Sequence, residues 1–437
     1  MLDSQVMHGE HSWRQPRRRR ERRPRSPVPG SRFPRSGSRF PVPGPRLVWS
    51  SPLPPTRSGI ADYAAELVPE LARLVPVVVV EPPDRAAGGW VWASGLERLP
   101  ANRPAPDGTV ELLHLGNNPY HQWVARRLRA FGGIAVLHDT VLHHLLVEEA
   151  AADGDWSRFE TELELAYGRH GAALAAARRW GLAGRRDPFL FPARQIYLRF
   201  ARGVIVHSER AAREVEAELP ALPVRRVPLA VAALPAGDRV RTRRGLGVGD
   251  SELLLVHLGF LTEAKGIVTV LRALLALEEL GVGFRLVIVG EGSEQEATAA
   301  LVGRLDLAAR VRFAGYAAPD ALGALVAAAD LGLVPRFPTA GETSAAALRF
   351  LAAGTPVVVA GHAQFLELPA DAALRVAPGR AGTTELVRHI AGLAASGQAR
   401  AAARTAARRA WEAGGHDPAR AAVTLLTAVR ELGRALA

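Results

Sequence analysis

The stretch Val334–Ala360 reads VPRFPTAGETSAAALRFLAAGTPVVVA and changes its pattern three times. It leaves an apolar strand, passes through a loop that holds Arg336 and Gly341, and enters a helix rich in alanine and leucine near Glu342. A glycine–threonine–proline triplet ends that helix, and β-branched residues begin the next strand. A strand, a helix and a strand in this order predict a parallel sheet covered by helices.

The predicted start of this helix is suited to binding an anion. Backbone N–H groups are unpaired at a helix N-terminus and carry a partial positive charge, which favours an anionic or hydroxyl-rich ligand. Thr343 or Ser344 can cap the helix, and Gly341 allows a ligand to approach the backbone closely. A capped turn without a ligand explains this stretch equally well, so the rest of the chain has to distinguish the two interpretations.

The positive charge of the chain is concentrated at its N-terminus. Residues 1–46 contain twelve arginines and three acidic residues, so they carry +9 of the formal net charge of +12 and leave 12 − 9 = +3 for the rest. The region is also rich in proline, glycine and serine, and we predict that residues 1–45 form a disordered basic tail. Binding of nucleic acid or an anionic surface through this tail is therefore a separate hypothesis for the function.

Composition excludes several other classes of protein. The absence of cysteine excludes disulfides, thiolate metal sites and a cysteine nucleophile. No apolar run is long enough to span a bilayer, and none follows the basic residues as it would in a secretory signal. We therefore expect a cytoplasmic protein, with the inner face of the membrane as a second location.

Strand and helix patterns alternate in two successive series. A segment rich in glycine, proline and arginine over residues 230–250 separates them. We predict an α/β protein with two doubly wound, Rossmann-like domains, an N-terminal one over residues 46–229 and a C-terminal one over residues 230–437. Ligands of such sheets bind outside the carboxyl ends of the strands, so the site is expected in a central cleft between the domains. The expected elements include strands at 46–49, 76–80, 110–115, 134–138, 204–207, 224–228, 253–259, 285–290, 311–314, 331–334 and 356–360, and helices at 156–180, 343–353 and 418–436.

The residues that follow these strands are of the types that bind a sugar diphosphate. Glycine backbones, an ammonium, a guanidinium and a helix N-terminus suit a diphosphate, whereas His, Asn, Asp and Glu suit sugar hydroxyls. Lys265 is the single lysine among 55 lysines and arginines, which suggests a phosphate contact, although chance survival of one lysine is an equal explanation. Neither a P-loop nor a GxGxxG after the first strand occurs, which argues against an NTPase and an ordinary dinucleotide enzyme. The residues after the strands include Gly59, Asp62, Asn117-Asn118, His138-Asp139-Thr140, Lys265, Glu291 and Arg336–Ser344.

Five stretches are specific in combination and in this order: SPLPPTRSGIADY (51–63), HLGNNPYH (114–121), VLHDTVLHH (136–144), GFLTEAKGI (259–267) and PTAGETSAAALRFLAAGTPVVV (338–359). Together they resemble glycosyltransferase family 4, the retaining enzymes of the GT-B fold, and in particular a bacterial branch with a GETS-type donor motif. The resemblance runs from about residue 46 to 380. It implies transfer of a sugar from a nucleotide-diphosphate sugar to an acceptor hydroxyl, with retention and without a metal or other cofactor. The implied partners are a nucleotide-sugar donor and a glycan or lipid-linked acceptor; peripheral membrane contact is compatible with this, and no specific nucleic acid is expected.

The resemblance and the positions of the loops assign a role to each candidate. His138 and Glu342 are the catalytic candidates, and His138 is expected to hydrogen-bond the donor sugar beside the reacting carbon. No metal ligand is expected. The acceptor side is assigned to Asp62, Asn117 and Asn118, and the donor and its phosphates are assigned to Gly59, Lys265, Arg336, Gly341, Thr343, Ser344 and Glu291.

Two positions depart from the family pattern. The pair of carboxylates that is usual in the family falls on Gly341 and Arg349, so we expect Glu342 to replace the first carboxylate from the next position. A second basic residue of the family is replaced by Phe260, and we expect Arg336 to supply that charge.

Several alternatives are kept beside this interpretation. The alternative enzyme is a sugar-nucleotide epimerase or phosphorylase on the same fold. The sequence Asp153-Gly154-Asp155 has the form of a DxD metal motif, but its place between two predicted helices favours a turn. Asp62 could contact the acceptor or cap its helix, and capping is favoured. The final helix at 418–436 is expected to cross back to the first domain.

Overall fold

The computed structural model describes residues 45–83 and 95–435 of the chain. The basic tail that we predict for residues 1–45 lies outside this range, except for its last residue. Among the helices in the described ranges, none combines the length and the apolar character that crossing a bilayer requires.

The N-terminal half forms a seven-stranded parallel sheet in the order β3-β2-β1-β4-β5-β6-β7. Its inner strands are apolar runs that are buried on both faces, as expected of a parallel sheet between two layers of helices. The strands are β1 (Arg46–Ser50), β2 (Val77–Glu81), β3 (Glu97–Pro100), β4 (Thr109–Leu115), β5 (Ile134–Leu137), β6 (Gly203–Val206) and β7 (Val224–Arg226).

Helices cover both faces of this sheet, because alternate residues of each strand point to opposite sides. Leu47 and Trp49 pack with α1 and the C-terminal helix α16 (Pro418–Ala435), whereas Leu113 and Leu115 pack with α2, α3 and α8. The helices of this half are α1 (Gly59–Ala72), α2 (Gln122–Phe131), α3 (His143–Asp153), α4 (Trp156–Tyr167), α5 (Arg169–Arg179), α6 (Asp187–Leu190), α7 (Arg194–Leu198) and α8 (Glu209–Glu218), with a 3₁₀ turn η2 (Pro119–His121) before α2.

The C-terminal half forms a six-stranded parallel sheet in the order β10-β9-β8-β11-β12-β13. In both sheets the first strand is central and the chain then winds outward, first to one side and then to the other. The strands are β8 (Leu253–Leu258), β9 (Phe284–Val289), β10 (Val311–Gly315), β11 (Leu331–Val334), β12 (Val357–Ala360) and β13 (Ala373–Val376).

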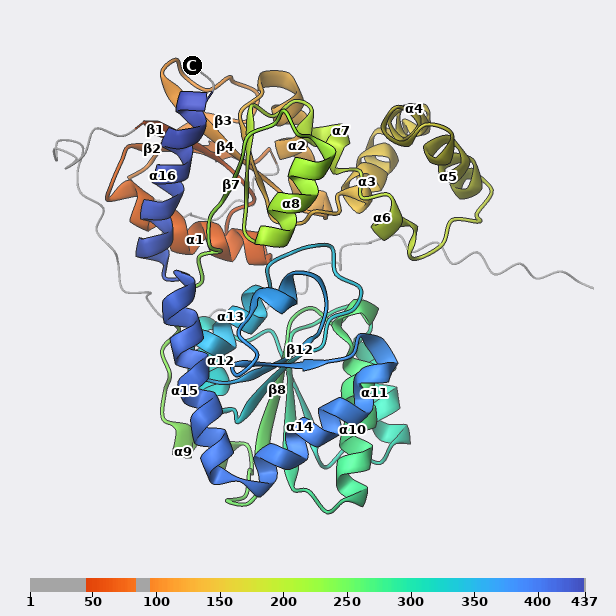
Figure 1. The fold of residues 1–437 in the computed structure, drawn as a ribbon, viewed down its shortest axis with the longest axis vertical. Helices are drawn as coiled ribbons and strands as arrows, with labels where there is room; N and C mark the ends of the chain where they lie inside the picture. Colours follow the sequence, from red (N-terminus) through yellow and green to blue (C-terminus); the bar gives the residue numbers. More distant parts are fainter. Residues whose placement is uncertain (1–44, 84–94, 436–437) are drawn as a thin grey trace, which may run out of the picture. The chain divides into compact units, whose positions relative to one another are not determined.

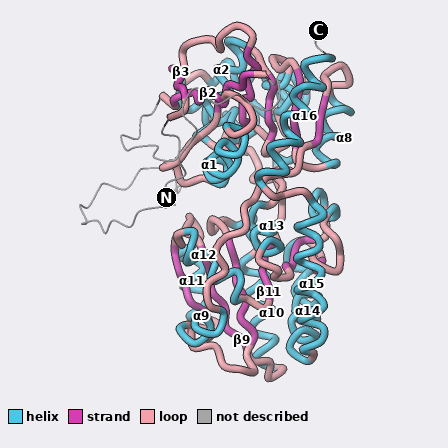
Figure 2. Tube along the Cα trace, turned by 90° about the vertical axis from the view of Figure 1, so that its left-hand side faces the viewer, coloured by secondary structure: helices cyan, strands magenta, loops and turns pink. Residues whose placement is uncertain are grey.

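Two groups of helices cover the second sheet (Figures 1 and 2). Leu255 and Ile288 pack with α10, α11 and α14, whereas Val256 packs with α12, α13 and α15. The helices are α9 (Arg239–Gly245), α10 (Ile267–Glu279), α11 (Gln295–Arg304), α12 (Pro319–Ala328), α13 (Ala345–Ala352), α14 (Thr383–Ala395) and α15 (Gly397–Gly414), with 3₁₀ turns η3 (Glu263–Lys265), η4 (Ala363–Glu367) and η5 (Gly379–Gly382).

The last helix, α16, returns to the first half of the chain. It packs along α1 and against β7 (Figure 1). Leu432 of α16 lies against Gly203 of β6, and Arg225 of β7 forms an ion pair with Glu431 at 2.7 Å. The hydrophobic core therefore runs from the first sheet through α16 into the second half.

The predicted fold class, two doubly wound parallel sheets with helices on both faces, is confirmed. The single helix predicted at 156–180 is wrong, because Gly168 has a φ of +57° and separates α4 from α5. Five short strands and helices, β3, β13, α6, α7 and α9, were not predicted. Strand β3 shows why: its sequence ERLP is largely exposed and has no apolar run to reveal it.

Candidate active site

The two sheets place the predicted residues at points where the strand order reverses. This reversal lies between β1 and β4 in the first sheet and between β8 and β11 in the second. Ligands of doubly wound sheets bind outside the carboxyl ends of the strands at such a point. Gly59 and Asn117 follow β1 and β4, and Lys265 and Arg336 follow β8 and β11.

Direct contacts join the loop after β5 to the loop after β11. The Val141 N–H donates to the carbonyl of Ala340 at 2.9 Å, and the Thr140 hydroxyl donates to the same carbonyl at 3.4 Å. Gly341 has a φ of +81°, and a Cβ atom at this position would lie 1.9 Å from the Thr140 hydroxyl oxygen. Glycine is required here by both the backbone conformation and the close approach. The group that approaches Gly341 closely in this structure is thus Thr140 of the same chain.

Arg336 and Glu342, which we assigned separately, form an ion pair with each other. Thr339 donates its hydroxyl to the other carboxylate oxygen of Glu342 at 2.8 Å. The amide of Gln364 donates to the Thr339 hydroxyl at 2.7 Å and to the backbone carbonyl of Glu342 at 2.6 Å. Thr339 and Gln364 were not predicted, because neither follows a strand directly. Together they fix Glu342 in the loop before α13.

Lys265 lies over the α-carbon of Gly259, and its ammonium is partly buried. Burial and then the nearby Arg336 guanidinium lower the pKa of Lys265 to about 7, against the opposing effects of Glu342 and Asp139. No ion pair joins Lys265 to a carboxylate in the described part of the chain. The effect of Arg336 on the pKa of Lys265 shows that the two cationic side chains lie near each other.

Asp139 is a member of this charged group that received no role from the sequence. It accepts a hydrogen bond from the Asn117 N–H at 2.7 Å. Burial and then the Glu342 carboxylate raise the pKa of Asp139 to about 7, although the Asn117 N–H, Arg336 and Lys265 act in the opposite direction. Its position beside His138 after β5 was the available signal. Two carboxyl groups and two cations thus meet between the strand ends of both sheets.

Helix α13 begins later than predicted. Its first residue is Ala345, and Ser344 is the N-cap, whose hydroxyl accepts a hydrogen bond from the Ala347 N–H at 3.3 Å. Thr343 does not cap the helix, and its hydroxyl is buried without a partner in the described structure. Because Ser344 has extended backbone angles, Glu342 lies in the preceding loop and not in the first helical turn.

His138 belongs to a buried cluster of aromatic and imidazole rings. Its Nε2 lies 3.0 Å from Nδ1 of His114, and its ring centre is 4.8 Å from His207 and 5.0 Å from Tyr63. Burial, followed by the neighbouring imidazoles, lowers the pKa of His114 and His138 well below the usual value. Nε2 of His114, Nε2 of His207 and the Tyr63 hydroxyl are buried without a partner in the described structure. His138 is thus a neutral imidazole at pH 7, held by a second histidine.

Of the three residues assigned to the acceptor side, two have other contacts. Asn118 caps η2 by accepting from the Tyr120 N–H at 3.1 Å. The Asn117 side chain accepts from the His144 N–H at 2.9 Å and so caps α3. The expectation that Asp62 caps α1 is wrong, because the N-cap is Ser58, whose hydroxyl accepts from the Ala61 N–H at 3.1 Å. Asp62 is exposed in the first turn of that helix.

Gly59 and Glu291 are exposed residues near the strand ends. Gly59 begins α1, and a Cβ atom there would meet no other atom within 4 Å. Glu291 follows β9, and its carboxylate lies 3.9 Å from the Arg57 guanidinium, which is placed 4.7 Å from the centre of the Tyr316 ring. The loop after β1 therefore approaches the loops after β9 and β10.

Arg349 occupies the position where the family usually has a carboxylate, and the structure shows what it contacts. It forms an ion pair with Glu66 of α1 and donates to the carbonyl of Ala232 at 2.6 Å. Glu66 in turn accepts from the Ala232 N–H at 2.7 Å. Arg349 thus connects α13 with α1 and with the segment between the two sheets.

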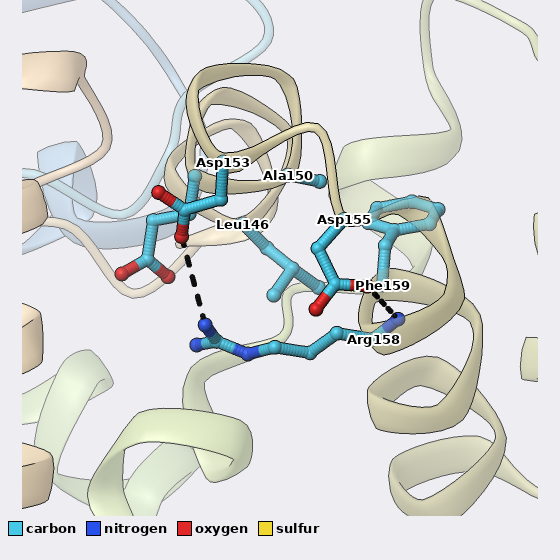
Figure 3. A pocket seen from close by; sticks show the side chains of 7 residues that line it. Leu146, Ala150, Asp153, Asp155, Arg158 and Phe159 are labelled. Carbon is cyan, nitrogen blue, oxygen red and sulfur yellow. Dashed lines mark hydrogen bonds and ion pairs between the residues drawn. The ribbon is translucent and has the colours of Figure 1, made fainter.

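The Asp153-Gly154-Asp155 sequence forms the predicted turn (Figure 3). Gly154 is left-handed at the end of α3, and Asp155 caps α4 by accepting from the Arg158 N–H at 2.9 Å. Asp153 forms ion pairs with Arg126 and Arg158. Both carboxylates therefore have structural partners, and no group of three or more metal-ligating side chains occurs within the described ranges.

The sequence of the second half is similar to a known enzyme family. Residues 252–396 match the family described as glycosyl transferases group 1, and this region contains Lys265, Glu291 and the segment Arg336–Ser344. An uncharacterized glycosyltransferase of Methanocaldococcus jannaschii (MJ1607) is 32% identical over 131 residues, which are 30% of this chain and 33% of that protein. The match therefore spans only a third of the relative's length.

Solved structures are similar over most of the chain. Sucrose-phosphate synthase from Thermosynechococcus elongatus has a TM-score of 0.59 at 17% identity, covering 90% of this chain and 100% of the other. Alr3699/HepE of Anabaena, solved with UDP-glucose, has a TM-score of 0.58 at 17% identity with the same coverage. WaaG, a glycosyltransferase involved in lipopolysaccharide biosynthesis, has a TM-score of 0.53 at 16% identity, covering 84% of this chain and 95% of the other. The chain has the GT-B fold of the glycosyltransferases. Within its second half, residues 252–396 are similar in sequence to group 1 of these enzymes.

Proposed function

We propose that the protein is a glycosyltransferase of family 4 that moves a sugar from a nucleotide-diphosphate sugar to an acceptor hydroxyl, with retention and without a metal ion. The observation that carries this proposal is the convergence of Lys265, Arg336 and the start of α13 at the strand ends of the second sheet. All three lie within the region that matches the glycosyl transferases group 1. The UDP-glucose in the HepE structure supports a nucleotide sugar as the donor.

The diphosphate is the leaving group in such a transfer, and its charge grows as the bond to the sugar breaks. The Lys265 ammonium and the Arg336 guanidinium would stabilise this charge, together with the unpaired N–H groups at the start of α13. These groups supply positive charge without a metal ion. Arg336 pairs with Glu342 through one nitrogen, and its Nε is buried without a partner in the described structure, so other N–H groups of the guanidinium can contact the diphosphate. The Glu342 carboxylate would bind a hydroxyl of the donor sugar.

Retention follows if the acceptor attacks the face from which the diphosphate leaves. The bond between the anomeric carbon and the phosphate oxygen breaks, and its electron pair goes to the leaving phosphate. The acceptor oxygen forms the new bond to the same carbon, and its proton passes to a phosphate oxygen. His138 would donate a hydrogen bond to the donor sugar beside the reacting carbon, as the neutral imidazole that its burial maintains.

A panel of nucleotide sugars tests the proposal. The full chain should bind one of them and hydrolyse it slowly or transfer its sugar. Lys265→Ala and Glu342→Ala should each lower kcat/KM by about a hundredfold, the size of effect seen when one group that stabilises a transition state is removed. Glu216→Ala, at an exposed position on α8, is the matched control and should leave the rate unchanged.

Two results would overturn the proposal. Wild-type turnover in both Lys265→Ala and Glu342→Ala would rule out the proposed active site. Failure of the protein to bind any nucleotide sugar would rule out the proposed reaction. A chelator added to the assay should leave turnover unchanged, and a loss of rate that a divalent cation restores would contradict the metal-independent mechanism.

A further inference from the structure

The segment 178–190, which reads RRWGLAGRRDPFL, exposes apolar side chains between arginines. Trp180 is 74% exposed, Leu182 71% and Leu190 73%. Among the large hydrophobic side chains of the described ranges, these three are the most exposed. A short segment that exposes several apolar side chains is more often part of a contact surface than an ordinary part of the protein surface.

The backbone of this segment is ordered, so the exposure is not that of a loose loop. Gly181, with a φ of +73°, ends α5, and its N–H donates to the carbonyl of Arg178 at 3.0 Å. The Leu182 N–H donates to the carbonyl of Ala177 at 2.8 Å. This hydrogen bond is typical of the Schellman motif, in which a glycine ends a helix. The chain thus presents Trp180 and Leu182 outward from a fixed turn.

The charges of the segment are complementary to an anionic surface. Residues 178–190 contain four arginines and Asp187, a net charge of 4 − 1 = +3. Two of these arginines, Arg179 and Arg185, form exposed ion pairs with Glu160 and Glu263 outside the segment. Two arginines precede Trp180 and two precede α6, so positive charge flanks the apolar side chains on both sides. Arginine and tryptophan next to aliphatic side chains are typical of segments that lie in the interfacial region of a bilayer.

We propose that residues 178–190 form a surface that docks on a bilayer containing anionic lipids, with Trp180, Leu182 and Leu190 entering its interfacial region. Three apolar side chains are few for a stable contact with a folded protein, which buries about 800 Å² on each partner. The same three are sufficient for shallow insertion when anionic headgroups bind the flanking arginines.

The docking surface is linked to the candidate active site on two sides. Phe189 of α6 packs edge-on against His144, whose N–H is bonded to Asn117, a neighbour of Asp139. Arg185 forms an ion pair at 2.9 Å with Glu263, which shares η3 with Lys265. A bilayer at this surface would hold a membrane-embedded acceptor close to the site; this part of the inference rests on the proposed function.

Vesicle binding of the full chain tests the surface. The probes are vesicles of phosphatidylcholine with about a third phosphatidylglycerol, with and without bromine atoms on the acyl chains near the headgroups. The basic residues 1–46 also attract such vesicles, so the decisive measurement is quenching of tryptophan fluorescence by the brominated lipid. Quenching should be present in the wild type and reduced in Trp180→Phe. Equal quenching in both would overturn the proposal.

A matched set of variants measures the contribution of the surface to affinity. The triple serine variant of Trp180, Leu182 and Leu190 should bind the vesicles about tenfold more weakly than the wild type, because the inserted apolar area is lost. The control replaces Val240, Leu280 and Val423, which are also exposed, by serine and should bind like the wild type. Equal affinity of the two triple variants would overturn the proposal.

Donor binding separates this proposal from the proposed function. A soluble nucleotide sugar should bind the triple variant and the wild type equally. If the wild type binds no nucleotide sugar but its Trp180 is quenched, the proposed reaction fails and the docking surface stands. If nucleotide sugars are turned over but Trp180 is not quenched, the docking surface alone fails.

Discussion

Lys265 and Asp139 are partly buried groups of opposite charge, and burial shifts their pKa values toward each other. The pKa of Lys265 is lowered to about 7 and that of Asp139 is raised to about 7. Each group therefore changes its charge near neutral pH. An anionic ligand next to them favours the protonated form of both, so ligand binding and proton binding are linked.

The affinity for a nucleotide sugar should therefore fall as the pH rises from 6 to 9. In the free protein Lys265 loses its positive charge above about 7, and Asp139 gains its negative charge above about 7. Both changes disfavour a diphosphate, whose own charge is constant over this range. Calorimetry at pH 8 in buffers of different ionisation enthalpy should detect proton uptake on binding. Lys265→Arg and Asp139→Asn should each remove part of the uptake, and proton release would contradict the assignment.

His114 should determine which nitrogen of His138 carries the proton. Nε2 of His114 is buried without a hydrogen-bond partner in the described structure. Burying an N–H without an acceptor costs more free energy than burying a nitrogen lone pair without a donor. We therefore expect the proton of His114 on Nδ1, which donates it to Nε2 of His138. The remaining proton of His138 is then on Nδ1.

The variant His114→Phe tests this positioning role. It should lower kcat by about tenfold, equivalent to one hydrogen bond of about 1.4 kcal/mol, with little change in KM. Nitrogen NMR of the labelled histidines should show a mixture of His138 tautomers in the variant and the Nδ1-protonated form in the wild type. His114→Gln, which retains a donor, should recover part of the rate. An Nε2-protonated His138 in the wild type would contradict the assignment.

The sequence predicted where most of the candidate residues lie in the fold but not their interactions. Lys265, Arg336 and His138 could be predicted because parallel strands direct their carboxyl ends to one edge of each sheet. The pairing of Arg336 with Glu342 could not, since it depends on how the loop before α13 folds. The contact of Arg349 with Glu66 joins residues separated by 283 positions, and no local pattern encodes such a pair.

At the scale of the element, α13 is the helix that begins directly after the loop of Arg336 and Glu342. Its predicted existence is correct, but the predicted start at Thr343 is wrong because Ser344 provides the cap. Both residues are good caps, and the choice between them depends on backbone angles that the surrounding loop imposes. Start positions of helices are accordingly less predictable than the helices themselves.

Replacing the cap should affect stability and donor binding together. Ser344→Ala should lower the free energy of unfolding by about 1 kcal/mol and weaken nucleotide-sugar binding by about threefold, because the first turn of α13 loses order. Ser396 caps α15 in the same way, by accepting from the Ala399 N–H at 3.0 Å. Ser396→Ala should therefore cost about the same in urea unfolding and leave donor binding unchanged. Equal effects of both variants on binding would exclude a role for the start of α13.

At the scale of the whole molecule, three segments meet at Arg349. The guanidinium pairs with Glu66 of α1 and bonds to Ala232, and the Glu66 carboxylate bonds to Ala232 as well. The side chains of Arg349 and Glu66 are only 12% and 17% exposed. An ion pair this far from water depends on both partners, because each compensates the buried charge of the other.

A double-mutant cycle should detect this dependence. Arg349→Met alone should lower the free energy of unfolding by about 2 kcal/mol, since it leaves the Glu66 carboxylate without its cation. Glu66→Gln combined with Arg349→Met should cost less than the sum of the two single changes. Urea unfolding of the four proteins gives the coupling energy, and strict additivity would show that the pair does not stabilise the junction.

Gly341 has a consequence for how closely the two halves of the chain fit. The Thr140 hydroxyl occupies the space that the smallest side chain at position 341 would need. The junction therefore has no room for even one methyl group at position 341. Any residue other than glycine there would force the loops after β5 and β11 apart. A descendant of this protein that lost the enzymatic activity but kept the contact between these two loops would still need glycine at position 341. The residue therefore reports on the assembly of the fold.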